Sequence, residues 1–218
     1  MVEIDLSSAD LGRVANQDVD ALIIANQNIW TPDSEPPTTY RVWPATDGPG
    51  QWENDPSTYS MGMQFRVTVA CAVTAIYFWR APRAFNGTDT TAFNPFATRC
   101  GIFDSDSHLL ISPAETIDAP GTNVGWIKHT LATPILIDTA HIYKVCVFGA
   151  PTGYSATAFY WDVGDGASGV TSGIIHADSA AEATAGDQDS FTTAAGDVTF
   201  PTSSFHAANY WIDIEVTV

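Results

Sequence analysis

The amino-acid sequence predicts an all-β protein: an antiparallel β-sandwich, jelly-roll-like in type, with an N-terminal arm. Three observations predict this class. Short runs rich in aromatic and β-branched residues recur along most of the chain. Turn-forming Gly, Pro and Asp residues separate these runs, and the 3.6-residue apolar pattern of helices is nearly absent. Many short strands between such turns are typical of an antiparallel sandwich.

Residues 1–40 differ from the remainder and predict an arm. Asp18–Trp30 is interpreted as a short helix or a single strand, and it carries Ile23, Ile24 and Trp30, which we expect to dock on a partner. The Pro36-Pro37 pair that follows favours an extended connector. We therefore expect a docking arm over residues 1–40 and one sandwich domain over residues 41–218.

The strands of the sandwich are predicted in order from residue 63. Residues 63–69 alternate between apolar and polar side chains, which indicates a half-buried strand, and residues 73–79 are apolar on both faces. Further strands are expected at 98–103, 109–112, 126–131, 135–138, 142–148, 158–162 and 210–218. The stretch 177–197 is rich in Ala, Thr and Asp, so we expect it to form a long surface loop.

The last strand has two distinct faces. One face carries apolar side chains that belong between the sheets, namely Tyr210, Ile212, Ile214, Val216 and Val218. The other face carries Trp211, Asp213, Glu215 and Thr217, and we expect it to be solvated. The chain is therefore expected to end on a core strand.

Composition excludes several classes of partner. The sequence has 25 Asp+Glu against 8 Lys+Arg, a net charge of -17, which argues against binding nucleic acid or an anionic membrane surface. No apolar run approaches the roughly 20 residues of a membrane helix. Three cysteines are a sparse set that fits a reducing compartment and buried thiols. A disulfide between Cys100 and Cys146 is the alternative if their strands pair.

Several motifs resemble a known family. They are Trp43-Pro44, Gly62-Met-Gln-Phe65, Ala75-Ile-Tyr-Phe78, Gly125-Trp126, Thr133-Pro134, Tyr143, Phe200-Pro-Thr-Ser-Ser204 and Asn209-Tyr-Trp-Ile-Asp213. Together they are similar to the domain-of-unknown-function family 4082, over residues of about 40–218. The resemblance implies a β-sandwich module of bacterial surface proteins and phage virion proteins. It implies a fold and a setting, and no particular reaction.

Candidates for catalysis are weak, so we expect no enzyme activity. Asp213 and Glu215 could form a glycosidase acid pair, since neighbours on one strand face can bring two carboxyl groups close together. A solvated strand face is the simpler explanation of these acids. The five histidines lack zinc-binding spacing, and no nucleophile motif is present.

Two ligand sites are expected on loops. Asp162 and Asp165 have the spacing of carboxylates in a calcium-binding loop, although a turn explains them as well. Calcium is the one cofactor considered. Of the seven tryptophans, Trp52 and Trp161 are expected to be partly exposed, and they could stack on sugar rings as a glycan platform.

These features favour a non-enzymatic phage virion protein, either a capsid decoration or a minor tail protein. The acidic front Met1–Asp5 lacks the pattern of a secretory signal, so we expect a protein made in the host cytoplasm that reaches the exterior by assembly. Its expected partners are other virion proteins, bound through the arm, and a host surface glycan. We expect the protein to form a homo-oligomer or to be present in several copies on each particle. The alternative is a carbohydrate-binding or adhesion module of a bacterial surface protein.

Overall fold

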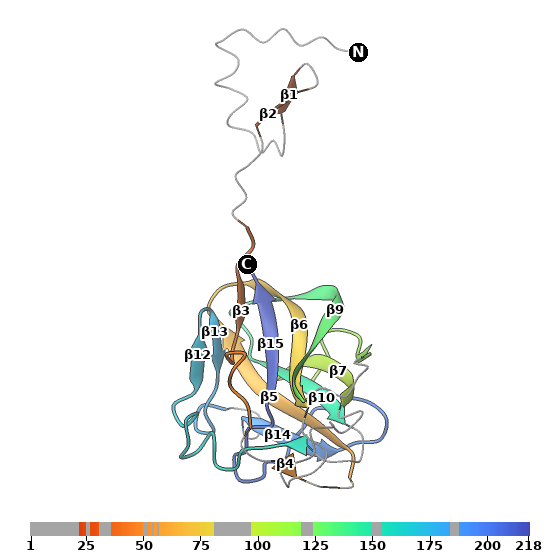
Figure 1. The fold of residues 1–218 in the computed structure, drawn as a ribbon, viewed down its shortest axis with the longest axis vertical. Helices are drawn as coiled ribbons and strands as arrows, with labels where there is room; N and C mark the ends of the chain where they lie inside the picture. The colour runs from red at the N-terminus through yellow and green to blue at the C-terminus, as the bar shows by residue number, and fades with distance from the viewer. Residues whose placement is uncertain are drawn as a thin grey trace. The chain divides into compact units, whose positions relative to one another are not determined.

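The computed structural model describes residues 22–24, 27–30, 36–49, 52–53, 55, 57–80, 97–118, 124–149, 154–183 and 188–218. The chain divides into two units, Met1–Pro37 and Thr38–Val218. The second unit is an antiparallel β-sandwich, and the described residues contain no helix (Figure 1). This confirms the predicted fold class. In particular, no described segment is a helix that could cross a bilayer.

In the first unit, β1 (Leu22–Ile24) and β2 (Gln27–Trp30) pair antiparallel. The expectation of a helix or a single strand over Asp18–Trp30 is therefore wrong, because this segment contains two short paired strands. The division between Pro37 and Thr38 falls just after the double proline. Thr39 already belongs to a sandwich strand, so the sandwich begins two residues earlier than its predicted start at residue 41.

One sheet of the sandwich contains the chain's last strand. Among the described residues it has four strands, in the order β3 (Thr39–Arg41), β15 (Ile212–Thr217), β6 (Cys71–Arg80) and β9 (Gly125–Ile137). Figure 1 shows these strands side by side in front of β5. Ile212, Ile214 and Val216 are fully buried, as predicted. Val218 is 47% exposed, so its predicted place in the core is wrong: the strand ends at Thr217.

The other sheet has seven strands among the described residues. Six follow the order β12 (Val170–Ser172), β13 (Ile175–Ala177), β5 (Tyr59–Val67), β10 (Tyr143–Gly149), β7 (Ala97–Asp104) and β8 (Glu115–Thr116). The seventh, β14 (Asp189–Thr193), pairs with the first half of β5, whereas β13 pairs with its last residues. A separate pair joins β4 (Trp52–Glu53) to β11 (Tyr154–Ser155).

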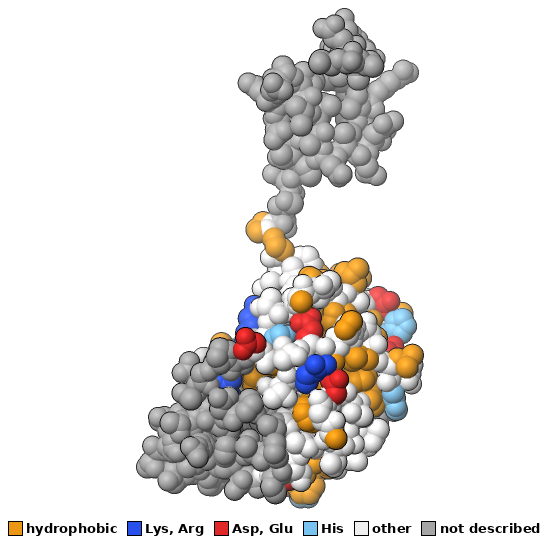
Figure 2. Space-filling model, turned by 90° about the vertical axis from the view of Figure 1, so that its right-hand side faces the viewer, with side chains coloured by type: hydrophobic (Ala, Val, Ile, Leu, Met, Phe, Trp, Pro, Cys, Tyr) orange, Lys and Arg blue, Asp and Glu red, His pale blue; other side chains and the backbone are white. Residues whose placement is uncertain are grey.

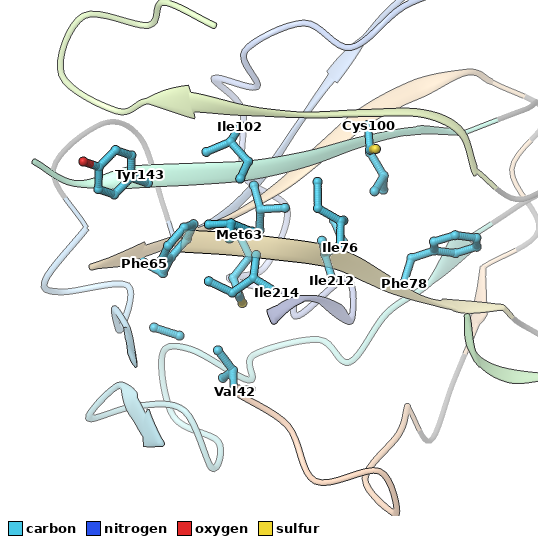
Figure 3. Close-up of a cluster of buried hydrophobic side chains, with 14 of the residues drawn as sticks. Val42, Met63, Phe65, Ile76, Phe78, Cys100, Ile102, Tyr143, Ile212 and Ile214 are labelled. Atoms are coloured by element: carbon cyan, nitrogen blue, oxygen red, sulfur yellow. The ribbon is translucent and has the colours of Figure 1, made fainter. Parts of the chain in front are cut away.

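The main hydrophobic core lies between the two sheets. Figure 3 shows Met63 and Phe65 of β5, Ile102 of β7 and Ile214 of β15 among the side chains that fill it. Each strand contributes alternate residues, as the two-residue side-chain period requires. The alternation predicted along 63–69 and 210–218 identified the core residues of β5 and β15, except that Val69 and Val218 are exposed.

The cysteines are free and buried, so the alternative of a Cys100–Cys146 disulfide is wrong. Their strands do pair, but Cys146 lies opposite Gly101 and Val147 lies opposite Cys100. Neighbouring residues of a strand point to opposite faces. Cys100 consequently faces the main core, whereas Cys146 lies in a second cluster on the other side of the sheet.

The predicted surface loop at 177–197 is largely wrong, because this stretch contains β14 and buried polar residues. Asp178, Gln188 and Asp189 are fully buried. Hydrogen bonds hold the first two: Gln188 Nε2 donates to the Gln64 carbonyl at 2.6 Å, and Gln64 Nε2 donates to Asp178 Oδ2 at 2.8 Å. Buried amides and carboxylates need such partners, and composition alone does not reveal them.

Residues after β14 cover the outer face of the seven-stranded sheet. The second cluster consists of Phe103, Cys146, Phe148, Ala194, Val198 and Phe200. Every residue of β10 is consequently buried, including Lys144, whose Nζ donates to Ser190 Oγ at 2.7 Å and lies 4.9 Å from the Phe200 ring centroid. The seven-stranded sheet therefore packs on both of its faces.

Three smaller expectations also changed. Residues 158–162 lie in a turn, and residues 109–112 form no strand but a single bridge between Leu110 and Phe103 of β7. The runs predicted separately at 126–131 and 135–138 form one strand, β9, whose register against β6 shifts between Val73 and Ala75.

On the face that Figure 2 shows, uncharged side chains predominate and Lys and Arg are few, in keeping with a charged fraction of 15%.

Truncating a side chain of β15 tests the position of the core. Ile214→Ala should lower the free energy of unfolding by about 2–5 kcal/mol, because it opens a cavity between the sheets. The matched control Val218→Ala removes an exposed side chain and should change it by less than about 0.5 kcal/mol. Urea unfolding measures both variants. Equal losses would contradict the placement of Ile214 in the core.

Candidate functional site

A pocket lined mostly by aromatic rings lies where β5, β11 and β14 meet the segment that leads into β15. Its volume is about 210 Å³. The lining residues are Asp55, Tyr59, Met61, Tyr154, Phe191, Phe205 and Tyr210. An apolar concavity with few polar groups is the usual form of a small-ligand site.

Edge-to-face ring contacts shape this pocket. The Tyr59 ring centroid lies 5.8 Å from that of Tyr154 and 5.4 Å from that of Phe191. Tyr154 in turn lies 5.6 Å from Tyr210, with the two rings nearly perpendicular. Such pairs stabilise one another beyond their buried area. The walls of the pocket are therefore well fixed by mutual packing.

Asp55 supplies a carboxylate to the pocket. Its Oδ2 accepts a hydrogen bond from the Tyr59 hydroxyl at 2.9 Å, and its Oδ1 accepts one from the Ser57 backbone N–H at 2.8 Å. The Ser57 hydrogen bond is the largest influence on this group, and the pKa of Asp55 is lowered from its usual value. Asp55 is therefore an anionic acceptor at neutral pH.

Exposed aromatic rings stack beside the pocket. Phe159 is 48% exposed and Phe205 is 54% exposed, although both are large apolar side chains. The His206 ring stacks between them, at centroid distances of 4.8 Å from Phe159 and 4.0 Å from Phe205. Val163, whose N–H donates to the Phe159 carbonyl at 3.2 Å, is 76% exposed. Exposed apolar groups gathered in this way mark a contact surface.

Backbone strain gathers at the same place. Phe159, His206, Ala207 and Trp211 are non-glycine residues with positive φ, between 43° and 59°. Each such conformation costs of order 1–3 kcal/mol and persists where the surrounding structure enforces it. Here the Phe159 N–H donates to the His206 carbonyl at 2.7 Å. Strain concentrated beside exposed rings supports a functional role for this surface. We call the pocket, together with Phe159, His206 and Val163, the aromatic site.

The sequence predicted a different aromatic platform. Trp161 is fully buried, so its predicted exposure is wrong. The turn after it folds back, and a Cβ on Gly166 would lie 2.6 Å from the Trp161 ring. Trp52 lies in β4, paired with the strand that carries Tyr154, but its side chain is outside the described residues. Its part in a glycan platform stays a prediction.

The sequence contains no clear signal for the exposed rings of the aromatic site. Phe159 falls within a stretch that was interpreted as a strand, and Phe205 lies between the two closing motifs. Phe159 itself and His206, which follows Phe205, have left-handed backbone conformations. Glycine usually occupies such positions, but here no glycine signals them in the sequence.

The other predicted sites are not assembled in the described structure. Asp162 and Asp165 are exposed in the turn after Trp161, and neither belongs to a group of three metal-ligating side chains among the described residues. Calcium binding there stays a prediction.

Ile23 and Ile24 lie in β1 and Trp30 lies in β2, but the structure does not describe their side chains. Docking through them stays a prediction as well.

Asp213 is fully buried, so the predicted solvated face of β15 is wrong at this residue. Its carboxylate pairs with Arg41 at 3.0 Å and accepts the backbone N–H groups of Val42 and Trp43 at 3.0 and 3.2 Å. Burial raises the pKa of Asp213 to about 6, against the opposing charge of Arg41. The residue anchors the chain after β3 to the sheet.

Glu215 is also occupied by neighbours. Its carboxylate accepts hydrogen bonds from Lys128 Nζ at 2.8 Å and from the Tyr77 hydroxyl at 2.9 Å. Burial opposes its ionisation, but the Lys128 and Tyr77 hydrogen bonds prevail, and the pKa of Glu215 is lowered. Asp213 and Glu215 thus serve separate structural contacts and do not face each other across a cleft.

A buried acid lies behind the aromatic site. Asp189 is fully buried in β14, and its Oδ2 accepts the Tyr210 backbone N–H at 2.6 Å. Burial raises the pKa of Asp189 to about 7, against the lowering effects of the Tyr210 and Trp161 N–H groups and of the Lys144 charge. Asp189 therefore gains a proton in the folded state at a pH where an unfolded chain stays ionised.

This elevated pKa predicts the pH dependence of stability. Between about pH 4 and pH 7 the folded protein holds a proton on Asp189 that the unfolded chain has lost, so the free energy of unfolding falls as pH rises. Asp189→Asn keeps an acceptor for the Tyr210 N–H without a titrating group. As pH rises, the free energy of unfolding of this variant should fall less than that of the unchanged chain. The difference should be roughly 1.4 kcal/mol for each unit of pKa shift that the substitution removes. Urea unfolding at pH 5 and pH 8 measures this, and parallel curves would contradict it.

Comparisons with known proteins identify a family. The family model of the domain of unknown function DUF4082 matches residues 46–212, which include the described residues of the aromatic site. No curated protein matches the chain. The matched span covers most of the sequence and contains the motifs singled out in it, apart from Trp43-Pro44 and the final Asp213. The chain therefore belongs to the DUF4082 family.

Proposed function

We propose that the chain is a non-enzymatic structural protein of a phage virion, a capsid decoration or minor tail protein, whose sandwich binds a saccharide of the host cell surface. The observation that carries this proposal is the aromatic site. It combines exposed rings, an adjoining aromatic pocket and one ionised carboxylate. Binding, rather than bond cleavage, is the chemistry that these groups favour.

A saccharide fits the aromatic site by its chemistry. A sugar ring presents C–H groups on its faces, which pack on aromatic rings, and hydroxyl groups at its edge, which need hydrogen-bond partners. The Phe159 and Phe205 rings offer apolar faces, and Asp55 offers acceptor oxygens within the adjoining pocket. A few polar groups in a largely apolar concavity give such a site its orientation and specificity.

The non-enzymatic part of the proposal rests on the state of the acids. Hydrolysis of a glycoside needs two carboxyl groups that face the same bond. In the described structure Asp213 is bound to Arg41, Glu215 to Lys128, and Asp189 is enclosed beside Tyr210. Asp55 is ionised and has no second carboxylate among the residues that line its pocket.

Display on a particle is supported by the organisation of the chain. The first unit contains a pair of short strands, and short paired strands can bind a partner by adding to the edge of its sheet. A net charge of -17 keeps a displayed domain soluble and repels it from DNA. The same aromatic site also favours a second candidate, a carbohydrate-binding or adhesion module of a bacterial surface protein.

Alanine substitutions test the binding surface. Phe159→Ala and Phe205→Ala should each weaken binding of the full chain to host cell-wall saccharides at least tenfold, because each removes an exposed contact ring. The matched control is Leu136→Ala, which removes an 83% exposed side chain at the far end of β15 from the site. A glycan array or titration calorimetry measures the affinities. Equal affinities for the three variants and the unchanged chain would reject the aromatic site as the binding surface.

Deletion of the first unit tests placement on the particle. Removing residues 1–37 leaves β3 intact, so the sandwich should fold with an unchanged Tm. We expect this truncated chain to be absent from purified particles, whereas the full chain is present in several copies by quantitative mass spectrometry. Incorporation of both chains would exclude the arm as the anchor. Absence of the full chain from particles would favour the adhesion module instead.

A further inference from the structure

Three metal-ligating side chains converge where β13 ends, away from the aromatic site. His176 belongs to β13, Asp178 follows the strand, and Glu182 lies in the next turn. His176 Nε2 is 3.2 Å from Glu182 Oε2 and 3.7 Å from Asp178 Oδ1. All three ligand atoms lie within 4.8 Å of one another, and among the described residues no other group of His, Cys, Asp and Glu does so.

Hydrogen bonds fix two of these ligands. Thr171 Oγ1 of β12 lies 2.7 Å from His176 Nδ1, which leaves Nε2 facing the two carboxylates. An outer contact of this kind orients the ligands of protein metal sites. The Ser179 N–H and hydroxyl donate to Glu182 Oε2 itself at 2.8 and 2.9 Å, so a metal bound at this oxygen would take the place of the Ser179 hydroxyl.

Asp178 is held as firmly as the other two. Gln64 Nε2 donates to its Oδ2 at 2.8 Å, and Arg66 Nε donates to its Oδ1 at 2.7 Å. Each carboxylate oxygen has two lone pairs, so Oδ1 retains an acceptor site that can face His176. Arg66 supplies one positive charge beside the two negative charges of the carboxylates, so negative charge remains that can attract a cation.

Glycine opens the space beside the ligand atoms. Gly169 has φ +73°, and a Cβ there would lie 2.8 Å from both His176 Nε2 and Glu182 Oε2. A Cβ at residue 169 would therefore crowd the two ligand atoms, and glycine avoids this contact.

We propose that His176, Asp178 and Glu182 bind one divalent transition-metal ion, for which Zn²⁺ is the probe. Zinc bonds of about 2.0–2.2 Å in a tetrahedron separate ligand atoms by roughly 3.3–3.6 Å. His176 Nε2 lies 3.2 and 3.7 Å from the two carboxylate oxygens, and all three ligand atoms lie within 4.8 Å of one another. An imidazole nitrogen favours zinc over Ca²⁺, which prefers oxygen ligands. The bound ion joins the β12–β13 hairpin to the turn that leads toward β14. This site is independent of saccharide binding.

Zinc titration of the full chain, first stripped of metal with a chelator, tests the site. Calorimetry should give one Zn²⁺ per chain, and a free Zn²⁺ concentration about 100-fold above the Kd should raise the Tm by about 5 °C. His176→Gln should weaken this binding at least tenfold. The matched control is His141→Gln, because His141 pairs with Asp138 at 2.8 Å in an exposed pair outside the cluster. It should bind zinc as the unchanged chain does.

A second variant separates loss of the ligand from loss of the fold. Glu182→Gln keeps a side-chain oxygen for the Ser179 hydrogen bonds but removes the charge, so it should fold with a similar metal-free Tm and bind zinc at least tenfold more weakly. The proposal would be overturned if the unchanged chain failed to bind zinc, or if His176→Gln and Glu182→Gln bound zinc as tightly as the unchanged chain does. Binding of Ca²⁺ as tight as that of Zn²⁺ would also overturn it.

Discussion

Four backbone hydrogen bonds join residues 157–161 to residues 206–209, and the aromatic site depends on them. Thr157 and Asn209 exchange two of these bonds at 2.9 and 3.0 Å, and the Phe159 and Trp161 N–H groups donate the other two. Asn209 Oδ1 also accepts the Trp211 N–H at 2.7 Å, directly before β15. This ladder ties two turns to a core strand, and it compensates for the left-handed conformations that expose Phe159 and Phe205.

The regular part of the fold could be predicted from the sequence, because its strands are rich in aromatic and β-branched residues and are separated by turn residues. Alternation between apolar and polar side chains identified the core positions of β5 and β15. The aromatic site could not be predicted in this way, because its strained residues are not glycines and its rings belong to no periodic run. Trp161 shows the converse error: a tryptophan beside exposed acids is buried, because the Gly166 backbone lies on its ring.

Buried polar residues explain the other differences between expectation and structure. Asp213 and Asp178 look like surface residues in the sequence, yet each lies in the interior beside an arginine that is distant in the chain. The stretch after β13 appears polar enough for a loop, but Gln64 and Gln188 bond to each other and anchor it to the sheet. These partners are long-range, so local pattern does not reveal them. Gln64 also holds Asp178, which lies beside His176 and Glu182.

The central claim is that the exposed rings at the end of this hydrogen-bonded ladder form the binding surface of the domain. A ¹H–¹⁵N NMR titration of the isotope-labelled full chain with a host cell-wall oligosaccharide tests it most directly. We expect saturable shift changes that gather at Tyr154, Phe159, Phe205 and His206. Changes that gather instead around Leu136 and Val218, at the opposite end of β15, would contradict it.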